Sequence, residues 1–240
     1  MNTLIVYAHP EPKSFNGALK DLAISVLTEQ GHKVKVSDLY AMNFKAVANQ
    51  DDFSKLADPD FLKLQVEQGK AYKNGTLAPD IVAEIEKLFW ADLVVLQFPM
   101  WWFSMPAILK GWVDRVFITG AIYGGTDSRG ARMYDNGGLQ GRKAMISVTL
   151  GGFAGMNSMS GINGDINQQL FHINHGVLYF AGMQVLPSFV AYAPAQVGQD
   201  GREQILDEYK QRLLSIQTTP PLSYCPLADY DHNFVLKSGD

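Results

Sequence analysis

The sequence predicts an α/β fold in which helices cover both faces of a doubly wound, five-stranded parallel sheet. Five segments, at residues 3–8, 32–39, 93–97, 142–149 and 184–192, are predicted strands, and amphipathic helix patterns separate them. The segments at 3–8 and 93–97 are apolar runs typical of buried strands, and the segment at 32–39 alternates between polar and apolar residues. Strands that alternate with helices pair in parallel, because each connection must cross the sheet. A chain of 240 residues is long enough to bury a complete core.

The first unit of the chain is a strand at 3–8, a helix and a second strand at 32–39. Ser14 and Asn16 can cap the start of the helix, and Gly31 suits the position after its last turn. Apolar residues share one face of this helix at helical spacing: Leu19, Leu22, Ala23, Val26 and Leu27. The length of the crossover predicts that the two strands pair in parallel.

Apolar residues at helical spacing predict five further helices, at residues 58–70, 80–90, 106–118, 165–181 and 202–216. Pro106 is tolerated in the first turn of its helix, because the missing N–H would have no partner there. Residues 119–141 are polar and rich in glycine, so we expect a lid, a binding loop or an interface arm outside the core. Prolines in residues 217–240 exclude a regular element, and the aromatic residues there predict a tail that packs on a surface.

Composition excludes several classes of partner. The net charge of −4 and the 18% of charged residues argue against nucleic acid. No apolar run is long enough for a membrane span, and the N-terminus lacks the basic start of a signal peptide. Cys225 is the single cysteine, so no intramolecular disulfide can form. These features together predict a cytoplasmic protein.

Three loops follow predicted strands at their carboxyl ends, which is where ligands bind in an open α/β sheet. The loop at 9–17 offers donors for a phosphate at a helix start, with His9 nearby, although an ordinary capped helix explains it equally simply. The loop at 99–105 holds the triplet 101–103, Trp-Trp-Phe, which either covers a flat ligand or packs on a neighbouring element. Glycines in the loop at 150–157 expose backbone N–H groups. Phosphate donors, aromatic planes and an N–H cluster together describe a flavin site.

Several separate motifs occur in an order that is specific to one family. They lie at residues 14–16, 37–44, 77–84, 97–112, 161–180 and 202–206, with Thr-Pro-Pro and Asn-Phe in the tail. In residues 97–112 the sequence contains Gln-Phe-Pro, Trp-Phe and Pro-Ala-Ile-Leu-Lys-Gly-Trp. From residue 2 to about residue 235 the chain resembles the NAD(P)H:quinone oxidoreductase family, the DT-diaphorase type of the flavodoxin-like fold.

This resemblance implies a flavodoxin-like catalytic domain over residues 1–216, followed by a tail at 217–240 that packs on the domain or on a dimer partner. It implies an enzyme that passes a hydride from NADPH or NADH to FAD, rather than FMN, and then to a quinone-like acceptor by a ping-pong mechanism. It also implies a homodimer with FAD at the interface. Neither the natural acceptor nor the preferred nicotinamide follows from the sequence.

The resemblance also assigns residues by position. It places the pyrophosphate against Ser14, Phe15, Asn16 and Ala18, with His9 beside them. It implies that the isoalloxazine ring is surrounded by Pro99, Met100, Trp101, Trp102 and Phe103. It also implies that backbone N–H groups point toward the ring from Thr149, Leu150, Gly151 and Gly152. It puts Arg202 and Leu206 at the adenine end, and it closes the substrate pocket with Tyr123 and Phe180 of the second subunit.

The chain departs from the family at positions that matter for chemistry. Asn157 and Asn163 stand where the family has a Tyr and a His that relay a proton. An amide can donate a hydrogen bond to a developing oxyanion, but it cannot change its protonation state near neutral pH. Tyr179 replaces a histidine of the metal-binding branch, so we expect no structural zinc on His175 and Cys225. An alternative function therefore stays open, a flavin-binding redox sensor or regulatory subunit with weak reductase activity.

Some conspicuous side chains are assigned no chemistry. His172 and His175 lie in the predicted helix 165–181, and we expect them to be core or interface groups. Lys110 and Arg115 are expected to be solvated or to face a dimer partner. Trp112 is expected to contribute to the core or to a dimer contact.

Overall fold

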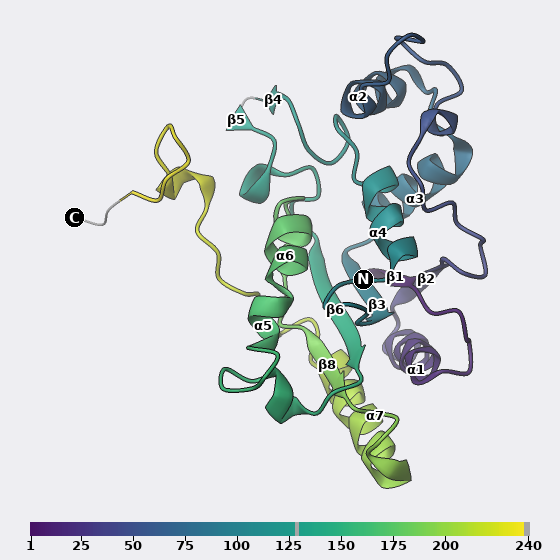
Figure 1. Ribbon diagram of the computed structural model, residues 1–240, viewed down its shortest axis with the longest axis vertical. Helices are drawn as coiled ribbons and strands as arrows, with labels where there is room; N and C mark the ends of the chain where they lie inside the picture. The colour runs from purple at the N-terminus through teal and green to yellow at the C-terminus, as the bar shows by residue number, and fades with distance from the viewer. Residues whose placement is uncertain (128–129, 238–240) are drawn as a thin grey trace.

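The computed structural model describes residues 1–127 and 130–237, and it confirms the α/β fold with a central parallel sheet (Figure 1). The spatial order is β2-β1-β3-β6, with β7 and β8 beside β6. All of these pairings are parallel. The four long strands are β1 (Asn2–Tyr7), β2 (Lys33–Asp38), β3 (Leu93–Pro99) and β6 (Lys143–Leu150).

The central strand β3 is buried along its whole length, because helices cover both faces of the sheet. Val94 and Leu96 pack into the core that α3 (Pro79–Trp90) and α4 (Ala107–Val116) share with the sheet, and Trp112 is fully buried there. Leu93 and Val95 pack into the opposite core, beneath α1 (Phe15–Glu29) and α7 (Gly198–Leu214). The prediction of a doubly wound sheet is therefore correct.

The fifth strand is interrupted. The predicted run 184–192 forms two short strands, β7 (Gln184–Val185) and β8 (Phe189–Tyr192), which both pair with β6. Pro187 lies between them and has no N–H to give to a ladder, which accounts for the break.

The prediction of one long helix at 165–181 is correct only in part, because the helix is divided. The segment contains α5 (Ile166–Gln169), α6 (Phe171–Ile173) and a π-helical stretch, η4 (Asn174–Tyr179). The Phe180 N–H donates to the carbonyl of His175, five residues back, at 3.0 Å. Such widened turns are frequent at functional sites. Apolar spacing cannot reveal them, because a single wide turn shifts the period very little.

The helix predicted at 58–70 lies further along the chain, as α2 (Leu64–Asn74), and ends at Gly75 in the left-handed conformation. Its start is displaced because the buried Glu67 carboxylate accepts the N–H groups of Ala57 and Asp58, at 2.7 and 3.1 Å, and holds them in a loop. A short 3-10 turn, η1 (Gln50–Asp52), precedes this region.

Residues 119–141 are not wholly outside the core, as had been expected. Ala121, Ile122 and Leu139 are buried. Between them lie the two-stranded hairpin of β4 (Thr126–Asp127) and β5 (Gly130–Ala131), and the 3-10 turn η2 (Tyr134–Asn136). The segment is thus an arm that is anchored in the core at both ends.

The C-terminal tail first follows the domain and then leaves it. The Leu222 N–H donates to the Val185 carbonyl at 2.7 Å, and the Tyr179 hydroxyl donates to the Cys225 carbonyl at 3.0 Å. After the 3-10 turn η5 (Leu227–Asp229) the chain stands away from the body (Figure 1, yellow). None of the helices described in residues 1–127 and 130–237 has the length and apolar character that a membrane crossing requires.

Arg115 is buried, with 1% of its side chain exposed, so the expectation that it is solvated or faces a partner is wrong. Its guanidinium donates to the carboxylates of Asp52 at 3.0 Å and Asp80 at 2.7 Å, and to the Lys45 carbonyl at 2.8 Å. Burial alone would raise the pKa of Asp80, but the hydrogen bond and charge of Arg115 outweigh it and hold that pKa below its ordinary value. Arg115 thereby fastens the segment at 45–52 to α3 and α4.

Candidate functional site

The loops that follow β1, β3 and β6 meet at the carboxyl edge of the sheet. Two of them enclose a cavity of about 220 Å³. Its lining residues are Met100, Trp102, Phe103, Leu150, Gly151, Gly152, Asn157 and Asn163. Of the three loops predicted at carboxyl strand ends, those at 99–105 and 150–157 supply this lining together with Asn163, and the loop at 9–17 supplies none of it.

One buried side chain at the start of α1 joins β3 and β6 at this edge. Asn16 accepts from Gln97 Nε2 at 2.9 Å and donates through Nδ2 to Thr149 Oγ1 at 2.8 Å. The Met100 N–H in turn donates to the Thr149 carbonyl at 2.9 Å. The role of Gln97 was not predicted from the sequence, although a polar residue in an otherwise apolar central strand was a usable signal. This network sets the relative positions of the loops.

The start of α1 leaves backbone N–H groups available. Ser14 caps the helix by accepting the Gly17 N–H at 3.1 Å. Among the described residues, the N–H groups of Phe15 and Asn16 have no hydrogen-bond partner. Orphan N–H groups at the positive end of a helix dipole suit a phosphate. His9 instead shapes the loop, because its Nδ1 accepts the Glu11 N–H at 3.0 Å.

Residues 101–104 form a tight reverse turn, the aromatic turn. Trp101 and Ser104 exchange backbone hydrogen bonds of 3.0 and 3.1 Å. Trp102 and Phe103 between them have φ angles of 51° and 59°, which lie in the left-handed region. For side chains with a Cβ this conformation costs about 1–2 kcal/mol per residue.

The side chains of the aromatic turn are open to solvent rather than packed. Trp101, Trp102 and Phe103 are 41%, 95% and 53% exposed. Packing on a neighbouring element within the chain therefore does not account for Trp102, and it accounts for Trp101 and Phe103 only in part. Strain and exposure together at a ligand edge indicate a binding function for the turn.

The glycine turn after β6 offers free backbone donors. Within the described parts of the chain, the N–H groups of Gly151 and Gly152 have no hydrogen-bond partner. Gln196 Nε2 donates to the Gly151 carbonyl at 2.6 Å and so orients this peptide. A Cβ added at Gly151 would meet no protein atom within 4 Å. A flat ring with acceptor atoms on its edge fits this combination of open space and unpaired donors.

Asn157 and Asn163 belong to a network of amides beside the glycine turn. Asn157 lies at the end of the 3-10 turn η3 (Ala154–Asn157) and donates to the Phe153 carbonyl at 3.0 Å. Its Oδ1 accepts from Asn163 Nδ2 at 3.2 Å and from Gln169 Nε2 at 3.3 Å. Gln169 was not predicted from the sequence. No described residue that lines the cavity changes its protonation state near neutral pH.

The remaining predicted site residues lie away from this cavity within the chain. The rings of Tyr123 and Phe180 are 5.7 Å apart and line a separate cavity of about 310 Å³. Arg202 and Leu206 lie on α7, where the Arg202 guanidinium donates to Gln199 Oε1 at 3.0 Å. The assignment of Tyr123 and Phe180 to the pocket of a second subunit stays a prediction. The assignment of Arg202 and Leu206 to an adenine also stays a prediction. Ala18 lies in the first turn of α1, where its N–H donates to the Ser14 carbonyl. Pro99 is the last residue of β3.

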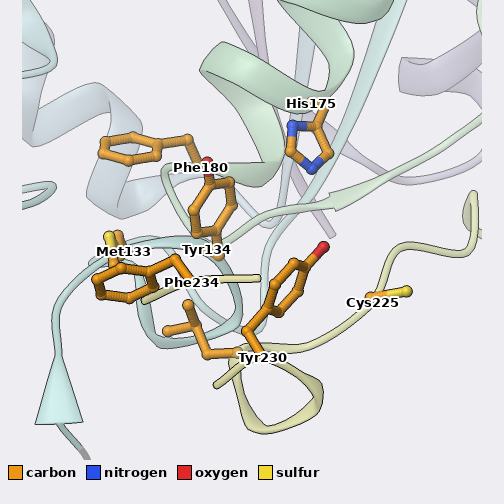
Figure 2. A pocket seen from close by; sticks show the side chains of 8 residues that line it. Met133, Tyr134, His175, Phe180, Cys225, Tyr230 and Phe234 are labelled. Atoms are coloured by element: carbon orange, nitrogen blue, oxygen red, sulfur yellow. The ribbon is translucent and has the colours of Figure 1, made fainter. Parts of the chain in front are cut away.

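A third cavity, of about 390 Å³, lies between η4 and the tail (Figure 2). Its lining is mainly aromatic: Met133, Tyr134, His175, Phe180, Cys225, Leu227, Tyr230 and Phe234. Burial lowers the pKa of His175, and burial together with nearby acidic groups raises the pKa of Tyr179 to about 12. No three His, Cys, Asp or Glu side chains of the described chain come together as a metal site.

Comparison with known proteins gives close relatives for almost the whole chain. The family model described as a flavodoxin-like fold matches residues 1–216. Human ribosyldihydronicotinamide dehydrogenase [quinone] is 46% identical over 220 residues, which cover 91% of this chain and 93% of that protein. Rat NAD(P)H dehydrogenase [quinone] 1 is 43% identical over 232 residues, 96% and 83% of the two chains. A crystal structure from Klebsiella pneumoniae superposes with a TM-score of 0.94 at 42% identity, covering 99% of this chain and 94% of that one.

Proposed function

The chain belongs to the NAD(P)H:quinone oxidoreductase family of the flavodoxin-like fold, and from this premise we propose that it is an FAD-dependent, two-electron quinone reductase. It is an oxidoreductase of the quinone type. The proposal adds FAD as the particular flavin, a ping-pong order of NAD(P)H and quinone, and a homodimer.

The observation that carries the proposal is the set of unpaired donors around the cavity at the sheet edge. Bound flavin supplies the hydride acceptor and donor. The Gly151 and Gly152 N–H groups would donate to the ring edge, where reduction places negative charge. Trp102 and Phe103 line the same cavity and would cover the ring. The free N–H groups at the start of α1 would hold the phosphates.

Two further features support the finer parts of the proposal. Arg202 and Leu206 lie on α7, which packs on the same face of the sheet as α1, and this supports an adenine and therefore FAD. For the homodimer, the support is an exposed apolar tail, with Phe234, Val235 and Leu236 all more than half exposed.

The side chains of the cavity can orient a substrate but cannot transfer a proton. Asn157 and Asn163 hold each other through their amides, and neither titrates in the neutral range. We therefore propose that the oxygen of the acceptor receives its protons from water. Asn157 and Asn163 stand where the resemblance would place a Tyr and a His for this step.

The same amide network favours a second candidate function, a flavin-binding redox sensor with weak reductase activity. A sensor needs the flavin cradle but no proton relay, and the described cavity has only the first. The two candidates differ in turnover, because a sensor would reduce simple quinones slowly.

An anaerobic titration tests both candidates. The purified full chain is examined by visible spectroscopy before and after the addition of NADPH, and then of a quinone. We expect a bound flavin band that bleaches with NADPH and recovers with quinone, and released flavin that chromatographs as FAD. A protein without flavin that gains no activity with added FAD would refute the proposal. A bound flavin that stays oxidised under excess NADH and NADPH would favour the sensor.

A further inference from the structure

One side-chain contact connects the aromatic turn to the opposite part of the fold. Ser104 Oγ and His172 Nε2 are 2.9 Å apart, although 68 residues separate them in the chain. Ser104 ends the aromatic turn, and His172 lies on α6. Among the described residues, no other side chain of the aromatic turn makes a hydrogen bond to another element.

The aromatic turn needs such support because little else holds it. Trp102 and Phe103 are in the left-handed region, which disfavours bulky side chains. Their exposed rings contribute little burial within the chain. A strained conformation persists only when the surrounding structure determines it. Besides its own backbone bonds and the tilted contact between the Trp101 and His9 rings, whose centroids are 6.5 Å apart, the turn has the Ser104–His172 contact for this purpose.

We propose that Ser104 and His172 are positioning residues that hold the aromatic turn in its binding conformation and thereby set how tightly the protein retains its flavin. This inference rests on the proposed function, because it takes the ligand of the cavity to be a flavin. Neither residue lines the cavity, so both act through Trp102 and Phe103, which do.

The chemistry of the pair suits a permanent support rather than a pH switch. A hydroxyl both donates and accepts, so Ser104 can donate to a neutral imidazole or accept from a protonated one. The contact is therefore available in either protonation state of His172. Its removal should weaken flavin retention at every pH.

The test uses the full-length flavoprotein and four variants: Ser104→Ala, His172→Ala, the double alanine variant and His172→Gln. Each is diluted stepwise, and released flavin is measured by its fluorescence, while visible circular dichroism reports the environment of the bound ring. We expect each alanine variant to bind flavin about 2- to 10-fold more weakly, as for the loss of one hydrogen bond. The double variant should be no weaker than either single one, because all three lack the same contact. His172→Gln should recover most of the affinity, since its amide can also bond the hydroxyl.

Ser25→Ala is the matched control, because it removes a hydroxyl that bonds only Glu29 on the exposed face of α1. Thermal unfolding of the flavin-free variants should match that of the wild type. Wild-type protein that binds no flavin would refute the proposed function itself. Wild-type protein that binds flavin while Ser104→Ala and His172→Ala bind it equally well would overturn the positioning role alone. Additive losses in the double variant would also overturn it.

Discussion

Gly151→Ala separates the folding role of the glycine turn from its binding role. The added Cβ would have no protein atom within 4 Å, and Gly151 is not in the left-handed region. Replacing a glycine under these conditions usually stabilises a protein by about 0.4–1 kcal/mol, because the unfolded chain loses freedom. The flavin-free variant should therefore unfold at the same temperature as the wild type or at a higher one.

The bound state should respond in the opposite direction. Gly151 lines the cavity with a free N–H, so a methyl group there occupies space that the flavin ring needs. Forcing one methyl into a packed contact costs about 1–3 kcal/mol. Such a cost corresponds to roughly 5- to 150-fold weaker flavin binding.

Dilution with detection of flavin fluorescence measures the affinity, and thermal unfolding of the flavin-free protein measures the stability. Gly155→Ala is a matched control, because its Cβ would also meet nothing within 4 Å while Gly155 does not line the cavity. Equal flavin affinity for Gly151→Ala, Gly155→Ala and the wild type would show that the Gly151 peptide does not approach the ring.

Three further predictions concern buried charge, a buried hydroxyl and the amide network. Arg115→Met leaves Asp52, which is 2% exposed, without its guanidinium partner, and should lower the free energy of unfolding in urea by about 3 kcal/mol. Lys110→Met, at an exposed ion pair, should change that free energy by no more than about 0.5 kcal/mol. Equal losses in the two variants would refute this prediction. Burial raises the pKa of Tyr209 to about 12 from 10.0, so the unfolded chain loses this proton first and stability should fall as pH rises from about 10 toward 12. Tyr209→Phe should flatten this alkaline decline in a pH series of thermal unfolding, and an unchanged slope would contradict the assignment. In stopped-flow measurements, the rate of flavin reduction by NADPH should not change between about pH 6 and 8 in the wild type. In Asn163→His, the rate should change in one step near pH 6.5, about the pKa of a free imidazole. A step of the same size in the wild type would show that another group titrates.

The strands were predictable because each carries an apolar or an alternating pattern of residues. The strand at 93–97 and the helix at 80–90 lie within two residues of β3 and α3. Ser14 was found as a cap because capping depends only on local residue type. Most of the fold could therefore be predicted from local sequence patterns.

Contacts between distant residues could not be predicted. Gln97 and Asn16 are 81 residues apart, and Ser104 and His172 are 68 apart, so no local pattern links them. Arg115 was misjudged for the same reason, because its partner Asp52 lies 63 residues earlier. The aromatic loop was predicted at the right place, but its strained backbone was not. Trp102 and Phe103 have positive φ angles, and bulky residues such as Trp and Phe rarely adopt them.

The two edges of the sheet differ in how they limit strand pairing between molecules. On one side β2 carries exposed lysines at Lys33 and Lys35, and a charged border repels a strand from a second molecule. On the other side Pro187 divides the last strand, and the Leu222 N–H already occupies the Val185 carbonyl. The border at β7 and β8 therefore presents only short strands, whereas β2 keeps a free edge on which the exposed lysines oppose pairing with a second molecule.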